Sequence, residues 1–242
     1  MGGEFSDFRV FSEADGSLLY NLGFSSSGSG AGDVNGDGFD DLIVTTGSGL
    51  AVLVVWGVDG TFLHVFDEVI DYLGFAPNFL NVNGDVNGDG FDDVIVGVDG
   101  RALVYSGVDG NLLHNLVVVA LDTGRFRRSV SGAGDVNGDG FDDVIVGARF
   151  GGSAHVFSGV DGSLLYFFNG DSFNPSDWFG WSVSGAGDVN GDGFDDLIVG
   201  SVCRIVVSMN QSVVLGCSPE LTAAFFTTSR VMIQLLGFLA TR

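Results

Sequence analysis

The sequence predicts an all-β fold, a β-propeller of four-stranded antiparallel blades. The decapeptide GDVNGDGFDD begins at Gly32 and returns almost unchanged at Gly84, Gly134 and Gly187. A period of about fifty residues is typical of arrays, solenoids and propellers, whereas a parallel β-helix has a much shorter period. Between the loops, 40 glycines separate short runs of Val, Leu, Ile and Phe, which indicates strands joined by tight turns.

The unit that opens at Asp85 illustrates the expected order of strands in a blade. Its loop leads into a first strand, DVIV, and a second strand is predicted over Ala102–Ser106. Asp109-Gly110 then makes a hairpin turn, because glycine accepts the positive φ of tight hairpins. A third strand is predicted over Leu112–Leu116, and a fourth precedes the following loop, as Trp181–Ser184 does in the last unit. Four such strands make one propeller blade.

The number of blades stays open, because the N-terminus enters the repeat at a second strand. Val10-Phe11-Ser12 aligns with Val104-Tyr105-Ser106, and Leu197–Gly200, after the fourth loop, supplies the first strand that the opening blade lacks. Four blades would then close into a ring without unpaired sheet edges. Alternatively, Arg204–Ser208 is a second strand and begins a fifth blade.

The expected domain organisation is a propeller over residues 1–209 and a divergent tail over 210–242. The tail is either an incomplete blade or a segment outside the propeller. Within the propeller, units open at about residues 33, 85, 135 and 188, after an N-terminal partial blade at 5–32. Cys203 and Cys217, toward the C-terminus, form either a disulfide bridge or two buried thiols.

The charge of the chain excludes some classes of partner. Nine basic residues, all Arg, stand against 31 acidic residues, and the formal net charge is −22. Such a chain repels nucleic acid and anionic membranes, so neither is expected as a partner. The apolar stretch Leu221–Ala240 is interrupted by polar residues, and Met1-Gly2-Gly3-Glu4 lacks the basic and apolar regions of a signal peptide. Membrane insertion is therefore not expected.

The repeated loop has the residue pattern of a metal site. Counted from its first Asp, it places side-chain oxygens at positions 1, 3, 5 and 9, a glycine at position 6, and a Phe carbonyl at position 7. Six or seven hard oxygen ligands suit Ca²⁺, whereas Zn²⁺ favours His or Cys. About four Ca²⁺ ions are predicted. The predicted ligands are Asp33, Asn35, Asp37, Phe39 and Asp41; Asp85, Asn87, Asp89, Phe91 and Asp93; Asp135, Asn137, Asp139, Phe141 and Asp143; and Asp188, Asn190, Asp192, Phe194 and Asp196.

An EF-hand type of loop and a bare turn are the two alternatives to this metal site. EF-hand and dockerin loops need an acidic residue at position 12 and a following helix, but position 12 is Val44 and a strand follows. The bidentate ligand is therefore expected at Asp41, and Asp40 beside it points away. A bare Asx- and glycine-rich turn is the other alternative. It does not explain why three carboxylates recur at fixed positions, where they repel each other unless a cation or protons neutralise them.

The loop DxNxDGxxD, repeated about every fifty residues and followed by a strand, resembles the FG-GAP repeat of integrin α-subunit propellers and related bacterial proteins. Phe179-Gly180 in the fourth unit carries the name-giving residues. Phe24 and Phe126 occupy the same position in their units, where Ser25 and Arg127 replace the Gly, and Ala76 replaces the Phe of the second unit. The GAP element survives only as Gly147-Ala148-Arg149.

The resemblance implies a propeller with calcium-binding loops, found outside the cell or on its surface and active in adhesion or ligand recognition. Family members are often seven-bladed, so the chain is either a ring of four to five blades or a fragment of a seven-bladed ring. An unidentified protein or glycan is the implied partner. The remaining alternatives are an accessory domain of a carbohydrate-active enzyme and a structural spacer in a surface protein.

No catalytic site is predicted. His64 and His114 align with Tyr20 and Tyr166 and are expected to pack between repeats, and no nucleophile elbow, P-loop or dinucleotide fingerprint is present. Two segments interrupt the repeat. Leu121–Arg128 gathers three Arg residues, which are expected near the acidic loops. In the segment DSFNPSDWFGW, Trp178 and Trp181 are candidates for ligand binding, because aromatic rings beside polar groups stack on sugars or fill pockets, while Phe179 is expected in the core.

Overall fold

The computed structural model describes residues 8–23, 25–46, 51–67, 79–82, 84–98, 100–118, 128–149, 151–170, 178–201, 206–207 and 213–214. Contacts between Cα atoms divide the chain into two compact units, Met1–Ser201 and Val202–Arg242. The boundary predicted at residue 209 falls inside the second unit. In that unit, β17 (Val206–Val207) pairs with β18 (Val213–Val214). Cys203, Cys217 and most of the predicted strand Arg204–Ser208 lie outside the described residues.

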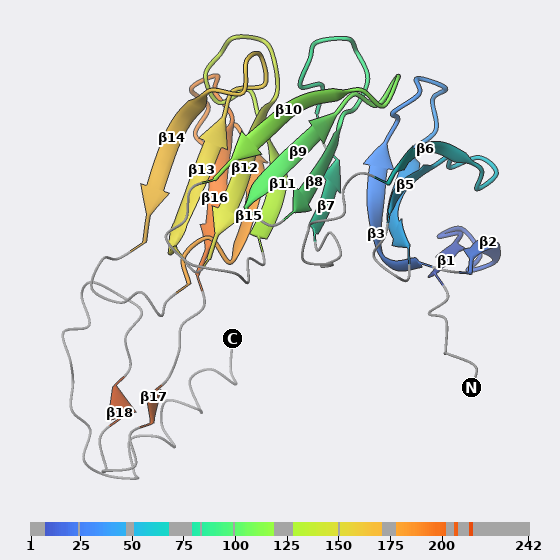
Figure 1. Cartoon of the computed structure of the whole chain (residues 1–242), viewed down its shortest axis with the longest axis horizontal. Coiled ribbons are helices and arrows are strands. Elements are labelled where there is room, and N and C mark those ends of the chain that lie inside the picture. The colour runs from blue at the N-terminus through green and yellow to red at the C-terminus, as the bar shows by residue number, and fades with distance from the viewer. Residues whose placement is uncertain are drawn as a thin grey trace. The chain divides into compact units, whose positions relative to one another are not determined.

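Three four-stranded antiparallel sheets form the body of the first unit, each a simple up-and-down meander (Figure 1). Blade 1 contains β3 (Ser25–Gly32), β4 (Asp41–Thr46), β5 (Val52–Val55) and β6 (Phe62–Phe66). Blade 2 contains β7 (Phe79–Val82), β8 (Val94–Val98), β9 (Arg101–Tyr105) and β10 (Leu112–Val117). Blade 3 contains β11 (Arg128–Gly134), β12 (Asp143–Ala148), β13 (Ser153–Phe157) and β14 (Leu164–Asn169). The predicted all-β fold of repeated four-stranded blades is confirmed.

Two half-sheets flank these blades. The N-terminal half-sheet pairs β1 (Phe8–Phe11) with β2 (Leu18–Leu22), and the C-terminal half-sheet pairs β15 (Ser182–Gly187) with β16 (Asp196–Gly200). Along the first unit, β7 contacts both β3 and β11, and β11 in turn contacts β15. Within the described residues β16 pairs only with β15, so the four-blade closure through Leu197–Gly200 is not formed.

The strand before each loop belongs to a different sheet than the sequence predicted. We expected it to end the preceding blade, but β3 pairs with β4, β11 with β12 and β15 with β16, each across its own loop. The predicted partial blade at 5–32 therefore loses β3 to blade 1. Each loop is a long hairpin within one sheet, so antiparallel pairing with its immediate neighbour in sequence determines the boundary of the blade.

The Asp-Gly hairpins form as predicted. In blade 2, Ser106 accepts a hydrogen bond from Gly110 N and donates its own N–H to Asn111 O, both at 2.9 Å. Gly110 has a φ of 71°, in the left-handed region that favours glycine. The backbone N–H of Asn111 donates to Asp109 and holds the pKa of that carboxyl below its usual range. The turn chemistry read from Asp-Gly therefore fixes the hairpin between the second and third predicted strands.

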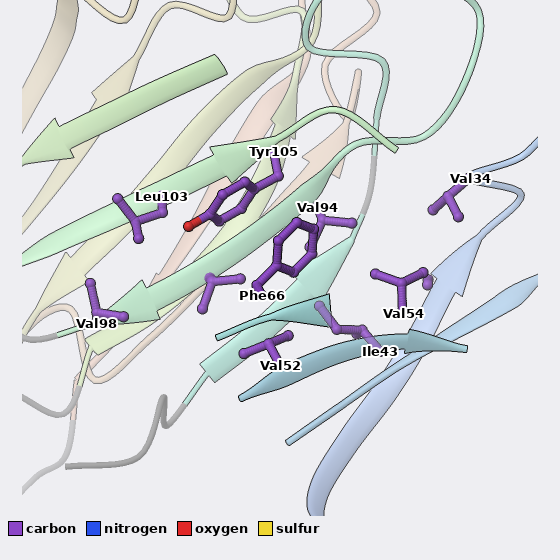
Figure 2. Close-up of a cluster of buried hydrophobic side chains, with 11 residues drawn as sticks. Val34, Ile43, Val52, Val54, Phe66, Val94, Val98, Leu103 and Tyr105 are labelled. Carbon is purple, nitrogen blue, oxygen red and sulfur yellow. The ribbon is translucent and has the colours of Figure 1, made fainter. Parts of the chain in front are cut away.

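The hydrophobic core lies between successive sheets. Figure 2 shows the cluster between blades 1 and 2, where Ile43 and Val54 of blade 1 are fully buried, as is Val94 of blade 2. Phe66 of blade 1 stacks on Tyr105 of blade 2 with ring centroids 4.2 Å apart. Equivalent clusters lie between blades 2 and 3 and between blade 3 and the C-terminal half-sheet. Because both faces of a middle strand are covered, its residues are apolar without alternation.

A polar ring on the third strand of one unit also binds the next unit. Tyr20 Oη donates to Gly57 O at 3.4 Å, and Nε2 of His64 bonds Gly107 O at 2.6 Å. His114 repeats the contact with Gly159 O at 2.5 Å. The repeat-packing role predicted for these positions is confirmed for Tyr20, His64 and His114, whereas Tyr166 is exposed.

Replacing Ile145, which is fully buried between blade 3 and the C-terminal half-sheet, by Ala should lower the free energy of unfolding by about 2–5 kcal/mol. Urea titration of the folded protein measures this loss. Val117→Ala, on the exposed side of β10, is the control and should change stability by less than about 0.5 kcal/mol. Equal losses in the two variants would contradict the assignment of the core.

Candidate metal-binding loops

All four loops have the same internal hydrogen bonds. In the first, Asp33 accepts from the backbone N–H of Asp37 at 3.0 Å and of Gly38 at 2.8 Å. Asn35 also accepts from Asp37 N, and Asp37 accepts from Phe39 N, both at 2.9 Å. The other three loops repeat these bonds. The side chains at positions 1, 3 and 5 thus stabilise one tight curl of backbone.

The Asp at position 9 anchors each loop to the sheet below it. In the second loop Asp93 is buried; its Oδ2 accepts from Val86 N at 2.9 Å and its Oδ1 from Gly107 N at 3.1 Å. Burial raises the pKa of Asp93 to about 6, and the charge of Asp89 adds to the shift. At neutral pH the ionised carboxylate therefore costs folding free energy unless positive charge compensates it.

The third loop has the same arrangement. Asp143 is buried and accepts from Val136 N and Gly159 N, both at 3.1 Å. Burial raises its pKa to about 6, with further contributions from the charges of Asp139 and Asp135. The carboxylates at positions 1, 5 and 9 therefore lie within electrostatic reach of one another in this loop.

The first loop tests whether a cation fits these residues. Asp41 is buried, and its Oδ2 has no hydrogen-bond partner, although its Oδ1 accepts from Gly57 N at 2.9 Å. Burial raises the pKa of Asp41, and the charges of Asp37 and Asp33 raise it further. A buried carboxylate that lies near two other carboxylates fits a hard cation.

The loops nevertheless differ from a formed metal site. Across the described part of the chain, no three acidic, histidine or cysteine side chains are close enough together to surround an ion. Several oxygens at positions 1, 3 and 5 are engaged by backbone N–H groups, and Trp56 Nε1 donates to Asp37. The predicted ligand set remains a prediction, with donors of the right chemistry in one short loop.

In the last three loops, the Asp at position 8 joins the loop to the one before it. Asp92 Oδ2 accepts from Asp33 N at 3.2 Å, and Asp142 Oδ2 accepts from Asp85 N at 2.9 Å. Asp195 makes the same bond with Asp135 N in the next pair of loops. The sequence assigned this position no partner, because a bond between loops about fifty residues apart leaves no local signal.

The Phe at position 7 also contacts the preceding loop. The ring of Phe91 lies against Gly36, the glycine at position 4 of the first loop, and leaves no room for a Cβ there. Phe141 covers Gly88 in the same way, and Phe194 packs on Gly138. We call the paired contacts of positions 7 and 8 with the preceding loop a loop junction. The first unit contains three such junctions.

A hollow of about 410 Å³ lies beside the last three of these loops. Three of its lining residues are position-8 carboxylates, Asp92, Asp142 and Asp195. The others are small residues just before the loops: Gly84, Gly132, Ala133, Gly134, Ser184, Gly185 and Gly187. Burial raises the pKa of Asp142, and the nearby charges of Asp195, Asp85 and Asp135 raise it further. The hydrogen bond that Asp142 accepts from Asp85 N lowers this pKa.

The two candidate ligand-binding tryptophans lie together. Trp178 and Trp181 stack with ring centroids 5.4 Å apart, and the guanidinium of Arg149 lies 4.5 Å from the centroid of Trp181. Trp181 is 40% exposed, and Trp178 has a φ of 52°, in the left-handed region that non-glycine residues rarely adopt. Phe179 packs against the core, as predicted. Arg125 and Arg127 of the predicted Arg cluster lie outside the described residues.

Three segments of the chain match the family model for the FG-GAP repeat, at residues 24–60, 126–165 and 179–201. The resemblance predicted from the loops is confirmed in these three segments. The second loop lies outside these segments but has the same hydrogen bonds as the others. Among the curated proteins, none matches this chain.

Two solved structures resemble the fold. The crystal structure of Chaetomium thermophilum Raptor aligns with a TM-score of 0.52 and 14% identity, over 93% of this chain and 19% of that chain. The structure of BBS1N in complex with ARL6DN, soaked with mercury, aligns with a TM-score of 0.49 and 14% identity, over 93% and 57% of the two chains. This chain thus spans less than two thirds of either, and the likeness concerns the fold alone.

Asp142→Ala should lower the free energy of unfolding by about 1–3 kcal/mol, because it leaves the part-buried N–H of Asp85 without an acceptor. Asp40→Ala removes the same position of the first loop, where no earlier described loop lies, and should have little effect. Both are measured by urea titration of dilute protein. An equal effect in both variants would show that the bond between loops contributes nothing.

Proposed function

We propose that this protein is a calcium-binding extracellular propeller module for adhesion or ligand recognition, in which Ca²⁺ stabilises the blades. The observation that carries the proposal is the crowding of carboxylates in the loops, where the charges of Asp33 and Asp37 act on the buried carboxylate of Asp41. FG-GAP repeats are typical of extracellular or surface proteins and are generally non-catalytic. No helix among the described residues is long and apolar enough to cross a membrane.

The side chains at positions 1, 3, 5 and 9 would hold the ion, together with the carbonyl of the Phe at position 7. The ion supplies positive charge, which favours the ionised form of the carboxylates at position 9. Those carboxylates meanwhile hold the backbone N–H groups at the start of the loop and in the hairpin of the same sheet. Ca²⁺ would therefore stabilise the loop and the strand that follows it together.

The expected affinity agrees with an extracellular location. Sites in extracellular modules bind Ca²⁺ with a Kd of about 10⁻⁴ to 10⁻³ M, so the ion concentration inside a cell would not fill them. At ~1 mM Ca²⁺ and a Kd of ~0.1 mM, each site stabilises the fold by roughly 1.4 kcal/mol. Four independent sites would give about 5–6 kcal/mol, comparable to the net stability of a domain.

Thermal unfolding in ~1 mM Ca²⁺ and in EGTA, combined with ion counting by native mass spectrometry, tests this function. We expect about four bound ions and a much lower melting temperature in EGTA. An equal concentration of Mg²⁺ is the control and should stabilise less, because Mg²⁺ demands stricter octahedral geometry. An unchanged melting temperature in EGTA and the absence of bound ions would show that the loops are turns that bind no calcium.

A single-loop variant gives a sharper test. Asp89→Asn removes one predicted ligand charge from the second loop and should reduce the number of bound ions by one or weaken one site by roughly tenfold. Asp109→Asn is the matched control, because Asp109 is an exposed hairpin residue outside the loops. Calcium titration by calorimetry measures both. Equal affinities in the two variants would remove position 5 from the ligand set.

The stacked pair of Trp178 and Trp181 supports recognition of a protein or glycan, rather than a spacer role alone. A glycan and matrix-protein array would separate recognition from a spacer. Trp181→Ala should abolish any binding found there with an unchanged melt, whereas Leu112→Ala, an exposed apolar residue of β10, should not. An accessory domain of a carbohydrate-active enzyme would bind glycans only.

A further inference from the structure

The hairpin between the last two strands of each blade begins with a residue that differs between the blades. It is Trp56 in blade 1, Ser106 in blade 2 and Ser158 in blade 3. The backbone around it is the same in all three. Trp56 N donates to Thr61 O at 2.8 Å and Trp56 O accepts from Gly60 N at 2.9 Å, and the two serines repeat both bonds. At this position the three hairpins therefore differ in the side chain and not in the backbone.

The side chain of Trp56 reaches the first loop. Its indole Nε1 donates to Oδ2 of Asp37, the predicted ligand at position 5. The other oxygen of Asp37 accepts from Phe39 N at 2.9 Å. In the third hairpin the serine bonds within its own turn instead, where Ser158 Oγ accepts from Val160 N at 3.2 Å. Both oxygens of the position-5 carboxylate in the first loop thus have an N–H donor, and one of these donors belongs to the hairpin.

The second and third loops supply this donor themselves. Oδ2 of Asp89 accepts from Nδ2 of Asn87, and Oδ2 of Asp139 accepts from Nδ2 of Asn137, both at 2.9 Å. This Asn is itself the predicted ligand at position 3. Its side chain carries an oxygen as well as an amide N–H, so a rotation of the amide presents an oxygen where the donor lay. An indole is a donor only and offers no oxygen to an ion.

An ion that enters the first loop therefore meets a competitor for Asp37. The indole holds an oxygen that Ca²⁺ would need, and a hydrogen bond to a carboxylate is stronger than one between neutral groups. The backbone of Trp56 is held by its hairpin bonds, and the next residue, Gly57, donates its N–H to Asp41 Oδ1 at 2.9 Å. The indole must then turn away from Asp37 or share the oxygen with the ion. Either change costs binding free energy, whereas the amide of Asn87 can join the ligands.

We propose that Trp56 lowers the calcium affinity of the first loop below that of the second and third loops. This inference rests on the proposed calcium binding and adds a positioning residue to it, because Trp56 acts through the carboxylate of Asp37. The first loop then fills at a Ca²⁺ concentration about three- to tenfold higher, which is the factor that one hydrogen bond contributes to a binding constant. Blade 1 would thus acquire its ion after blades 2 and 3.

Calcium titration of the full chain, followed by ¹H–¹⁵N NMR, tests this order. Each loop has a glycine at position 6 whose backbone N–H donates to the Asp at position 1, so the amides of Gly38, Gly90 and Gly140 report the first three loops separately. We expect a midpoint for Gly38 about three- to tenfold higher than for the other two glycines. The indole N–H resonance of Trp56 should shift with the same midpoint as Gly38.

Variants of Trp56 test the cause of the difference. Trp56→Phe keeps an aromatic ring but removes the donor, and it should lower the Gly38 midpoint to that of Gly90 and Gly140, which should not change. Trp56→Ser, which copies the other two hairpins, should do the same. Damage to the fold would weaken binding instead, so the direction of the change separates this role from a structural one. Trp181→Phe is the control, because Trp181 lies outside the loops, and it should alter no midpoint.

Two results would overturn the inference. One is an unchanged or higher Gly38 midpoint in both Trp56→Phe and Trp56→Ser, and the other is an equal midpoint for all three glycines in the wild type. Ion counting by native mass spectrometry separates these results from failure of the proposed function. Bound ions together with an unmoved Gly38 midpoint overturn the role of Trp56 alone, whereas the absence of bound ions from all these chains overturns calcium binding as well.

Discussion

The buried aspartate at position 9 of the first three loops is the interaction on which the repeat depends. In blade 2, Asp93 accepts hydrogen bonds from Val86 at the start of the loop and from Gly107 in the hairpin. One carboxylate thus joins a loop, the strand that follows it and the next turn of the same sheet. Because this carboxylate is buried, ionising it costs free energy, and burial raises the pKa of both Asp93 and Asp143 to about 6. The fold therefore requires a charge that opposes its own stability at neutral pH.

This conflict connects the fold with the proposed function. Each loop adds carboxylates at positions 1 and 5 near the buried one, and each junction adds another at position 8. Backbone N–H groups donate hydrogen bonds to these carboxylates and so stabilise their ionised form, but they do not neutralise the negative charge. A cation that entered the loops would relieve the remaining repulsion. Stability, calcium dependence and an extracellular location would then have one electrostatic origin.

The sequence predicted the elements that depend on local chemistry. The Asp-Gly hairpins, the second and third strands of each unit and the ring at positions such as His64 all follow from short patterns repeated at a regular period. It misplaced the strand before each loop, because a strand of alternating glycine and small residues has no side-chain pattern that identifies its sheet. It also missed the position-8 carboxylates and Phe91 on Gly36, because these contacts join different repeats.

The sequence alone therefore determined the class of fold, the period and the donor set of the loops. Composition, turn residues and repeated carboxylates are local properties, and they need no knowledge of which strands meet. Only the tertiary structure decided which strand completes which sheet and how one loop binds the next. The sheets depend on backbone hydrogen bonds across each loop, and the bonds between loops join residues 57 to 60 positions apart, so neither leaves a local pattern in the sequence.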